Sequence, residues 1–290
     1  MSAEAKTRLA IQVVLYNSLS KLPKLLAGID MLQTENMEVV VRFFDNAPGS
    51  GDREFIRSQS LRFPVEFIQF SQGNLGFGRA HNILAAEHGY DSDFLLLLNP
   101  DTIPFDDVLQ RLLAAAGANP GAALVEAAQF PVEHQKAFDF DSGQTDWCCA
   151  CCLLVRSNAF RKLGGFDENL FMYCEDVDLS WRAWLAGYEC LYVPTAKCAH
   201  MSQADDVGKD RATEIHHMEL GNLYLRRKYF GEEAVAEHLV YIRSTFSEEL
   251  AEQLASDLAL TGEPGRVAAT HPRVRYASDH KNFGPIRWDP

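Results

Sequence analysis

Short apolar runs alternate with helical stretches along residues 9–130, and this alternation limits the folds that the chain can adopt. The apolar runs cover residues 9–15, 37–44, 65–70, 94–98 and 122–130. The stretches predicted as helices cover residues 18–32, 52–60, 78–87 and 106–118. Parallel strands need crossover connections of this kind, so the pattern predicts an α/β fold with a mostly parallel central sheet flanked by helices.

The pattern changes after Gln135. Strands are expected over residues 149–155 and 190–193, the second stopped by Pro194, and helices over residues 157–163 and 175–186. Residues 205–260 have a polar helical pattern, whereas residues 262–290 show no periodicity and are either irregularly packed or mobile. We therefore expect one part over residues 1–203 and a C-terminal helical extension with an irregular tail over residues 204–290.

The charge balance argues against several partners. The 290 residues include 40 Asp and Glu against 27 Lys and Arg, a formal net charge of −13. Nucleic acids and anionic membranes attract basic surfaces, and the longest basic run is Arg226, Arg227 and Lys228. No apolar run approaches the roughly 20 residues of a membrane-spanning helix. We expect no nucleic acid partner and no transmembrane segment, while peripheral membrane contact through that basic run stays open.

The cysteines indicate a reducing compartment. There are seven, an odd number, and the first residues carry no secretory signal, so we expect reduced thiols in a cytoplasmic protein. Cys148, Cys149, Cys151 and Cys152 stand together, but their spacing does not match a zinc knuckle. Because apolar residues follow them, we interpret them as small hydrophobic side chains of a buried strand.

Polar side chains directly follow three of the predicted strands. They are Tyr16 and Asn17, Asp45 and Asn46, and Asn99 and Asp101. The carboxyl ends of parallel strands share one edge of a sheet, where open α/β sheets bind ligands. A single residue of this kind often only caps a helix or starts a turn, but the repetition favours a nucleotide site. There, Asp45 would accept hydrogen bonds from a nucleoside, and Asp101 would bind Mg²⁺ or Mn²⁺.

A glycine-rich loop over residues 73–79 connects the third predicted strand to a helix. It matches neither the dinucleotide-binding pattern nor the Walker pattern. Its glycines would allow a ligand to approach the backbone, and Arg79 could pair with a phosphate. A tight loop without a ligand is the alternative.

A second polar cluster covers residues 164–178. Glu175 and Asp176 begin a predicted helix, where the helix dipole favours acids in any case, but such a carboxylate can also be a general base. Asp178 and Arg182 have the spacing of a helical ion pair, which we interpret as structural. His200 ends a short strand, and a lone histidine of this kind is more often an ordinary core or surface residue.

The motifs form an ordered series that is more specific than any one of them. The series runs through Tyr16-Asn17-Ser18, Phe44-Asp45-Asn46, residues 74–82, Leu98-Asn99-Pro100-Asp101-Thr102, residues 164–168, residues 173–179, Tyr192-Val193-Pro194 and His200. Over about residues 9–202 it resembles glycosyltransferase family 2, in particular its rhamnosyltransferase-like members. The resemblance implies a GT-A fold with a Rossmann-like sheet, a nucleotide-sugar donor, a divalent metal (Mg²⁺ or Mn²⁺) and inversion at the anomeric carbon.

The resemblance also implies roles for individual residues. Nucleotide binding would fall to Tyr16, Asn17, Asp45, Asn46, Asn74, Gly76, Arg79 and Asn99. Asp101 and His200 would bind the metal, and Asp176 would be the catalytic base beside Glu175. Asn99 stands where the family's metal motif usually has its first acid, so metal affinity should be modest and depend on the donor. The sequence after Asn46 also departs from the family's pattern.

These residues predict an inverting glycosyltransferase that moves a sugar, with rhamnose as one candidate, to a hydroxyl of a glycan or glycoconjugate. The donor could be a dTDP-, UDP- or GDP-sugar. The acceptor could be a lipid-linked glycan met at the inner face of the membrane. A sugar nucleotidyltransferase and a non-catalytic nucleotide-sugar-binding scaffold are the alternatives, although the first normally has a basic glycine-rich loop after its first strand. The helices after residue 204 could form a homodimer interface or shield the catalytic part.

Overall fold

The computed structural model describes residues 5–69, 73–88, 90–131, 136–201 and 211–279. The strands are β1 (Thr7–Leu15), β2 (Met37–Asp45), β3 (Val65–Gln69), β4 (Phe94–Leu98), β5 (Thr102–Pro104), β6 (Ala122–Phe130), β7 (Cys152–Arg156) and β8 (Glu189–His200). They form one sheet in the order β3-β2-β1-β4-β7-β6-β8-β5. Strands β3, β2, β1 and β4 are parallel, as are β6 and β8, while β7 and β5 run antiparallel to their neighbours. The predicted mixed α/β fold is confirmed.

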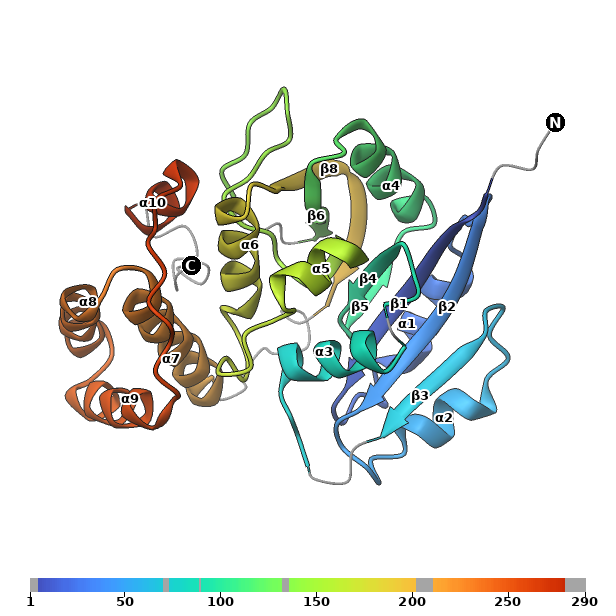
Figure 1. Cartoon of the computed structure of the whole chain (residues 1–290). Coiled ribbons are helices and arrows are strands. Elements are labelled where there is room, and N and C mark those ends of the chain that lie inside the picture. The colour runs from blue at the N-terminus through green and yellow to red at the C-terminus, as the bar shows by residue number, and fades with distance from the viewer. Residues whose placement is uncertain (1–4, 70–72, 89, 132–135, 202–210, 280–290) are drawn as a thin grey trace.

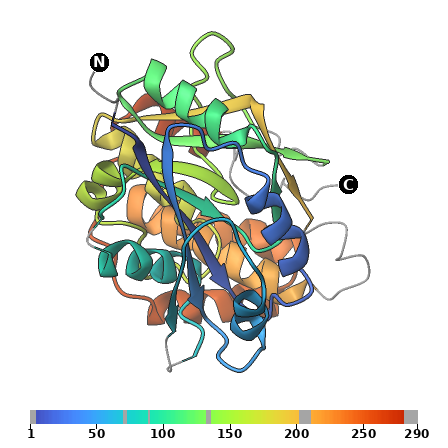
Figure 2. The same cartoon turned by 90° about the vertical axis from the view of Figure 1, so that its right-hand side faces the viewer.

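Helices cover both faces of this sheet (Figure 1). Those of the first part are α1 (Leu22–Asp30), α2 (Asp52–Ser58), α3 (Phe77–Glu87), α4 (Val108–Ala118), α5 (Ser157–Leu163) and α6 (Glu175–Leu185). Figure 2, which looks from the right-hand side of Figure 1, shows α1 and α3 on opposite faces of the sheet. The last helices are α7 (Ala212–Tyr229), α8 (Glu232–Thr245), α9 (Glu248–Leu260) and α10 (Pro272–Asp279). Helices α7, α8 and α9 pack on one another beyond α6, away from β1–β3.

Burial explains why the central strands read as continuous apolar runs. Leu95, Leu96, Leu97 and Leu98 of β4 are each at most 1% exposed, because both faces of this strand are covered. The core also continues from the sheet into the C-terminal helices, where Leu223 and Leu254 are fully buried in the same cluster as Leu96. The extension is therefore packed against the part that carries the sheet.

Some predicted element boundaries are wrong. The first helix begins at Leu22 instead of Ser18, because Pro23 is tolerated in the first turn of a helix but would disrupt the interior of one that began at Ser18. Pro194 does not stop the last strand, which continues to His200. The pairing of β8 with β6 jumps from Val193↔Ala127 to Lys197↔Ala128, so Pro194 lies in a bulge where no ladder hydrogen bond is needed.

The cysteine cluster and the tail also differ from prediction. Cys148, Cys149 and Cys151 precede the strand, which begins at Cys152, but all four are buried free thiols, as expected for small hydrophobic side chains. Residues 272–279, predicted without periodicity, form α10; residues 280–290 of the predicted tail lie outside the described residues. The sequence pattern did not predict α10, because this polar segment has a low mean hydropathy and offers few apolar residues from which a helical stripe could be recognised.

Candidate functional site

The predicted nucleoside residues lie at the ends of β1 and β2, which pair in parallel so that Leu15 faces Asp45. Asp45 is 3% exposed, and burial raises the pKa of its carboxyl group although the backbone N–H of Ala47 donates to Oδ1 at 3.1 Å. Tyr16 is 55% exposed, and Asn17 has a φ of +50° in the turn that follows β1. One exposed aromatic ring and one buried carboxylate therefore stand at adjacent strand ends.

Asn46 differs from these residues because its side chain is hydrogen-bonded to the glycine-rich loop. Its Nδ2 donates to the carbonyl oxygen of Gly76 at 3.0 Å, and its Oδ1 accepts from the backbone N–H of Leu75 at 2.9 Å. Asn46 is 2% exposed. It ties the glycine-rich loop to the end of β2, so a role in nucleotide binding would come through the loop that it holds.

Asp52 also belongs to this region, although none of the sequence motifs includes it. It is fully buried at the first position of α2, and its two carboxylate oxygens accept from the backbone N–H of Ser18 at 3.1 and 2.8 Å. This bond fixes the turn that carries Tyr16 and Asn17. An acid at a helix start is usual for the helix dipole, so the sequence offered no signal for this distant partner.

The glycine-rich loop packs directly on the second polar cluster. Gly76 has a φ of +82°, and a Cβ atom there would lie 2.2 Å from the carbonyl oxygen of Phe171. The backbone N–H of Phe77 donates to that same oxygen at 3.0 Å. Asn74 holds the loop from within, since its Oδ1 accepts from the Gly76 N–H at 2.9 Å. Residues 74–77 and the segment around Phe171 are therefore one structural unit.

Arg79 is predicted to pair with phosphate, and it lies at the surface. Its side chain is 51% exposed, and its Nε lies 3.4 Å from Oε2 of Glu168, which is also exposed. A water-exposed ion pair of this kind contributes little to stability, so Arg79 can exchange partners easily.

Asp101 and His200, the predicted metal ligands, lie next to each other. Strands β5 and β8 pair so that Thr102 faces His200, which places His200 Nε2 3.4 Å from Asp101 Oδ1. On its other side, His200 Nδ1 lies 2.8 Å from Oε1 of Gln129. When Nδ1 donates to this amide oxygen, Nε2 keeps its lone pair for a metal.

The surroundings of Asp101 suit a cation. Burial alone would raise the pKa of its carboxyl group, but the hydrogen bond and charge of His200, with the charge of Lys21, lower it. Lys21 Nζ lies 3.5 Å from Asp101 Oδ2, a contact that the sequence did not reveal. Oδ1 of Asn99 is buried and accepts no hydrogen bond from the described residues.

This donor set fits a divalent metal. Carboxylate and amide oxygens suit both Mg²⁺ and Mn²⁺, whereas the imidazole nitrogen is a poor ligand for the hard Mg²⁺ ion and so favours Mn²⁺. Within the described part of the chain, no group of three or more His, Cys, Asp or Glu side chains could hold a metal. Asp101 and His200 would therefore supply two ligands, and further ones would have to come from Asn99, water or the oxygens of a bound diphosphate.

Glu175 and Asp176 begin α6 behind an unusual turn. Tyr173 and Cys174 have φ values of +67° and +66°, a conformation that non-glycine residues rarely adopt, so the surrounding structure must hold it. Helix α7 supplies this hold: a Cβ atom on Gly221 would lie 3.0 Å from the Tyr173 carbonyl oxygen. The two acids are 6% and 8% exposed.

The cysteine-rich segment connects Asp176 with the end of β4. Asp176 Oδ2 accepts from the backbone N–H of Ala150 at 3.2 Å. The adjacent carbonyl oxygen of Cys151 accepts from the N–H of Asn99 at 3.0 Å. A single short segment therefore contacts both the predicted base and the strand end that carries the predicted metal motif.

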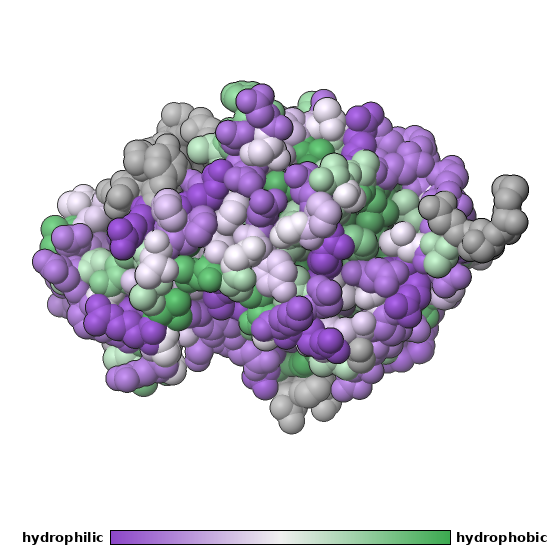
Figure 3. Space-filling model, turned by 45° about the horizontal axis from the view of Figure 1, so that its top comes forward, coloured by the Kyte–Doolittle hydropathy of each residue, from purple (hydrophilic) through white to green (hydrophobic). Residues whose placement is uncertain are grey.

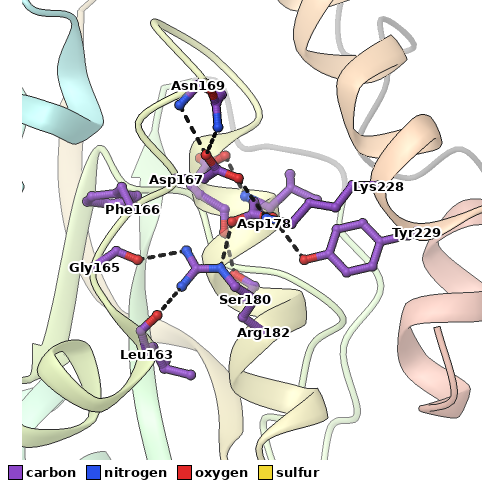
Figure 4. A network of polar contacts seen from close by, with 12 residues as sticks. Leu163, Gly165, Phe166, Asp167, Asn169, Asp178, Ser180, Arg182, Lys228 and Tyr229 are labelled. Atoms are coloured by element: carbon purple, nitrogen blue, oxygen red, sulfur yellow. Dashed lines mark hydrogen bonds and ion pairs between the residues drawn. The ribbon is translucent and has the colours of Figure 1, made fainter. Parts of the chain in front are cut away.

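Behind α6 lies a buried ionic network (Figure 4). Asp178 Oδ1 accepts from Lys228 Nζ at 2.6 Å and from the Tyr229 hydroxyl at 2.8 Å, and its Oδ2 accepts from Arg182 Nε at 2.7 Å. Lys228 also pairs with Asp167 at 2.7 Å. Burial would raise the pKa of Asp167, but Lys228 lowers it. The predicted structural pair of Asp178 and Arg182 is confirmed, and it belongs to a network that joins α6 to α7.

The basic run of α7 is not the membrane-facing patch that the sequence suggested. Arg226 is 8% exposed and its Nε donates to Asn222 Oδ1 at 2.9 Å. Arg227 Nη1 donates to the Leu258 carbonyl oxygen at 3.0 Å, and Lys228 is buried in the ionic network. These cations are occupied inside the fold, so the run does not form an exposed basic patch for membrane contact.

The rest of the surface is polar on the face drawn in Figure 3, where hydrophobic residues form small separate patches among hydrophilic ones. Among the helices of the described residues, none has the length and apolar character needed to cross a membrane.

The chain is similar to proteins named as glycosyltransferases. No protein-family model matches the sequence. The chain is 30% identical over 192 residues to the rhamnosyltransferase WbbL of Escherichia coli, a match that covers 54% of this chain and 73% of that protein. It is 27% identical over 255 residues to the N-acetylglucosaminyl-diphospho-decaprenol L-rhamnosyltransferase of Mycobacterium tuberculosis, over 72% of this chain and 81% of that protein. A solved mannosyltransferase from Pyrobaculum calidifontis, in complex with GDP-Man and Mn²⁺, shares the fold with a TM-score of 0.55 at 18% identity, over 96% of this chain and 85% of that one.

Proposed function

This chain belongs to glycosyltransferase family 2, where it groups with the rhamnosyltransferase-like members, and we propose that it transfers rhamnose from a nucleotide-sugar donor to a hydroxyl group of a glycan. We propose that the transfer inverts the configuration at the anomeric carbon. That it is a glycosyltransferase acting with a nucleotide sugar follows from its relatives and its GT-A fold. Inversion, the donor and the acceptor are the proposed part. Residues 1–203 would form the catalytic part and residues 204–290 the extension.

The observation that carries the mechanism is the position of Asp176. This carboxylate begins α6, is nearly buried, and is oriented by the N–H of Ala150 at 3.2 Å. As general base it would take the proton of the acceptor hydroxyl, whose oxygen then attacks the anomeric carbon opposite the leaving nucleoside diphosphate. Holding donor and acceptor side by side would supply much of the rate. Glu175, at the same helix start, would help to orient the acceptor.

The donor would lie along the strand ends. Asp45 would accept hydrogen bonds from the nucleoside, the Tyr16 ring and Asn17 would flank the base, and the loop of Asn74, Gly76 and Arg79 would border the pocket with Asn99. Asp101 and His200 would hold Mn²⁺ or Mg²⁺, and the bound cation would neutralise charge on the diphosphate. Lys21, 3.5 Å from Asp101, would add a second positive charge there.

The acceptor is proposed from the relatives. The Mycobacterium tuberculosis protein is named for a sugar on a diphospho-decaprenol lipid. We propose a lipid-linked glycan of this class as the acceptor, met in the cytoplasm at the inner face of the membrane.

Substitution of the base tests this function. Asp176→Asn should abolish transfer while calorimetry still detects donor binding with Mn²⁺, because the amide keeps the shape of the side chain but cannot accept the proton. Asp107→Asn is a matched control, since Asp107 pairs with Arg111 of α4 and is not one of the predicted site residues. Turnover by Asp176→Asn at the wild-type rate would reject Asp176 as the base. A thermal-shift screen of dTDP-, UDP- and GDP-sugars with Mn²⁺ would identify the donor.

A further inference from the structure

A buried ion pair lies beside the segment that orients Asp176. Glu126 of β6 is fully buried, and the side chain of Lys136 is 2% exposed where its Nζ contacts Glu126 Oε2. The Lys136 ammonium also stands over aromatic rings, 4.0 Å from the ring centroid of Trp147 and 5.7 Å from that of Tyr192. Charges are costly to bury, so a pair placed here calls for an explanation other than stability.

The pair has a direct contact with the segment. Glu126 Oε2 accepts from the backbone N–H of Cys149 at 2.9 Å, and the next N–H along the chain, that of Ala150, donates to Asp176 Oδ2 at 3.2 Å. Two consecutive backbone donors are thus bound by two buried carboxylates from different elements. The two bonds come from successive peptides that share Cys149, so the orientation of one constrains the other.

Neighbouring contacts fix the same segment at both ends. The N–H of Cys148 donates to Ser180 Oγ at 3.0 Å, and the Cys151 carbonyl oxygen accepts from Asn99 at 3.0 Å. Between these points, Glu126 binds the Cys148–Cys149 peptide, which directly precedes the peptide that carries the Ala150 N–H. Burial raises the pKa of Glu126 and would lower that of Lys136, but Glu126 keeps the pKa of Lys136 above its ordinary value.

We propose that Glu126, neutralised by Lys136, is a positioning residue for the transfer reaction: it holds the Cys148–Cys149 peptide through the Cys149 N–H and so fixes the next peptide, whose Ala150 N–H orients Asp176. The inference rests on the proposed role of Asp176 as the base. Lys136 makes it possible to keep a carboxylate at this depth, and the oxygen that binds Cys149 does the positioning.

Two double variants separate the oxygen from the charge. Glu126→Gln with Lys136→Met keeps an acceptor for the Cys149 N–H, whereas Glu126→Leu with Lys136→Met has none, and neither leaves a buried charge unpaired. We expect kcat within threefold of wild type for the Gln variant and about 10²-fold lower for the Leu variant, the scale expected for a misplaced catalytic group. Donor affinity by calorimetry should be unchanged in both.

Other results would overturn the proposal. Equal kcat values in the two variants would show that the acceptor oxygen does not matter. If the Leu variant does not fold, Glu126→Asp, which keeps both charges but draws the oxygen back by one methylene, should lower kcat about tenfold without changing donor affinity. A wild-type kcat for that variant would then reject the positioning role.

Amide hydrogen exchange keeps this test separate from the proposed function. Peptides covering residues 148–151 should exchange faster in the Leu variant than in the Gln variant, whatever group serves as base. Equal exchange would reject the contact itself. Full activity of Asp176→Asn together with faster exchange in the Leu variant would reject Asp176 as the base, and with it the catalytic part of the proposal, while the structural contact stands.

Discussion

Asp101 Oδ1 lies 3.4 Å from His200 Nε2. Asp101 stands between β4 and β5, and the antiparallel pairing of β5 with β8 brings it next to the end of β8. Neither residue would be a metal site alone. The contact depends on β8 continuing past Pro194, since His200 is its last residue.

Removal of the imidazole should weaken metal binding. In His200→Ala we expect the Mn²⁺ dissociation constant, measured by electron paramagnetic resonance with a nucleoside diphosphate present, to rise about 10- to 100-fold. His216→Ala is the control, because His216 pairs with Asp257 within the helical extension. Unchanged Mn²⁺ affinity in His200→Ala would exclude this histidine as a ligand.

Lys21 should have opposite effects on the metal and on the nucleotide. Its ammonium lies 3.5 Å from Asp101 Oδ2 and competes with a cation for that carboxylate, so Lys21→Ala should raise Mn²⁺ affinity without nucleotide roughly twofold to fivefold. Affinity for a nucleoside diphosphate should fall, because a positive charge is lost. Lys24 is exposed on α1, the helix that Lys21 precedes, and it borders the same small cavity, so Lys24→Ala is the control variant. Parallel changes in both affinities would contradict the competition.

Loss of Lys228 should destabilise the junction of α6 and α7. Lys228→Met leaves the fully buried Asp178 without its ammonium partner, and we expect a loss of about 3–5 kcal/mol in the free energy of unfolding, measured with urea. Lys162→Met on the exposed side of α5 should change it by less than about 0.5 kcal/mol. Equal stability of the two variants would mean that the network contributes nothing.

The same network predicts a dependence of stability on pH. Lys228 holds the pKa of folded Asp167 below the ordinary value of 3.8, so the contribution of this carboxylate is complete above that pH. It should be lost as the pH falls through the lower, folded pKa. Urea unfolding between pH 6 and pH 2 should therefore show a steeper acid loss in the wild type than in Lys228→Met, and identical slopes would contradict it.

Alanine substitutions at Gly76 and Gly73 should distinguish the cost of backbone strain from the cost of a steric clash. Both have positive φ values, +82° and +93°. A Cβ atom on Gly76 would lie 2.2 Å from the Phe171 carbonyl oxygen, whereas one on Gly73 would meet no atom of the described residues within 4 Å. Gly73→Ala should cost about 1–2 kcal/mol from strain alone. Gly76→Ala should cost more and lower donor affinity, because the loop must leave the segment around Phe171. Similar stability and donor affinity in the two variants would show that the loop tolerates the displacement.

The sequence by itself determined the alternating elements, the strand ends with polar side chains, and the series of motifs that places the chain in its family. These are local properties: an apolar run predicts a buried strand, and an Asx residue after it marks the strand's end. The helix over residues 157–163 and the pair of Asp178 and Arg182 were predicted correctly for the same reason, since both depend on residues within one or two turns.

Only the tertiary structure decided which charged groups meet across the chain. Arg226 and Lys228 read as a basic surface run, but folding buries Lys228 against Asp178 of α6 and the loop before it, and Arg226 beside Asn222 of its own helix. Asp52 at Ser18 and Glu126 at Cys149 are carboxylates whose partners lie far away in sequence. A sequence pattern reports the spacing of neighbours, whereas the burial and pairing of a charge depend on which elements pack together. The order of the strands therefore decided how the site predicted from the motifs is built.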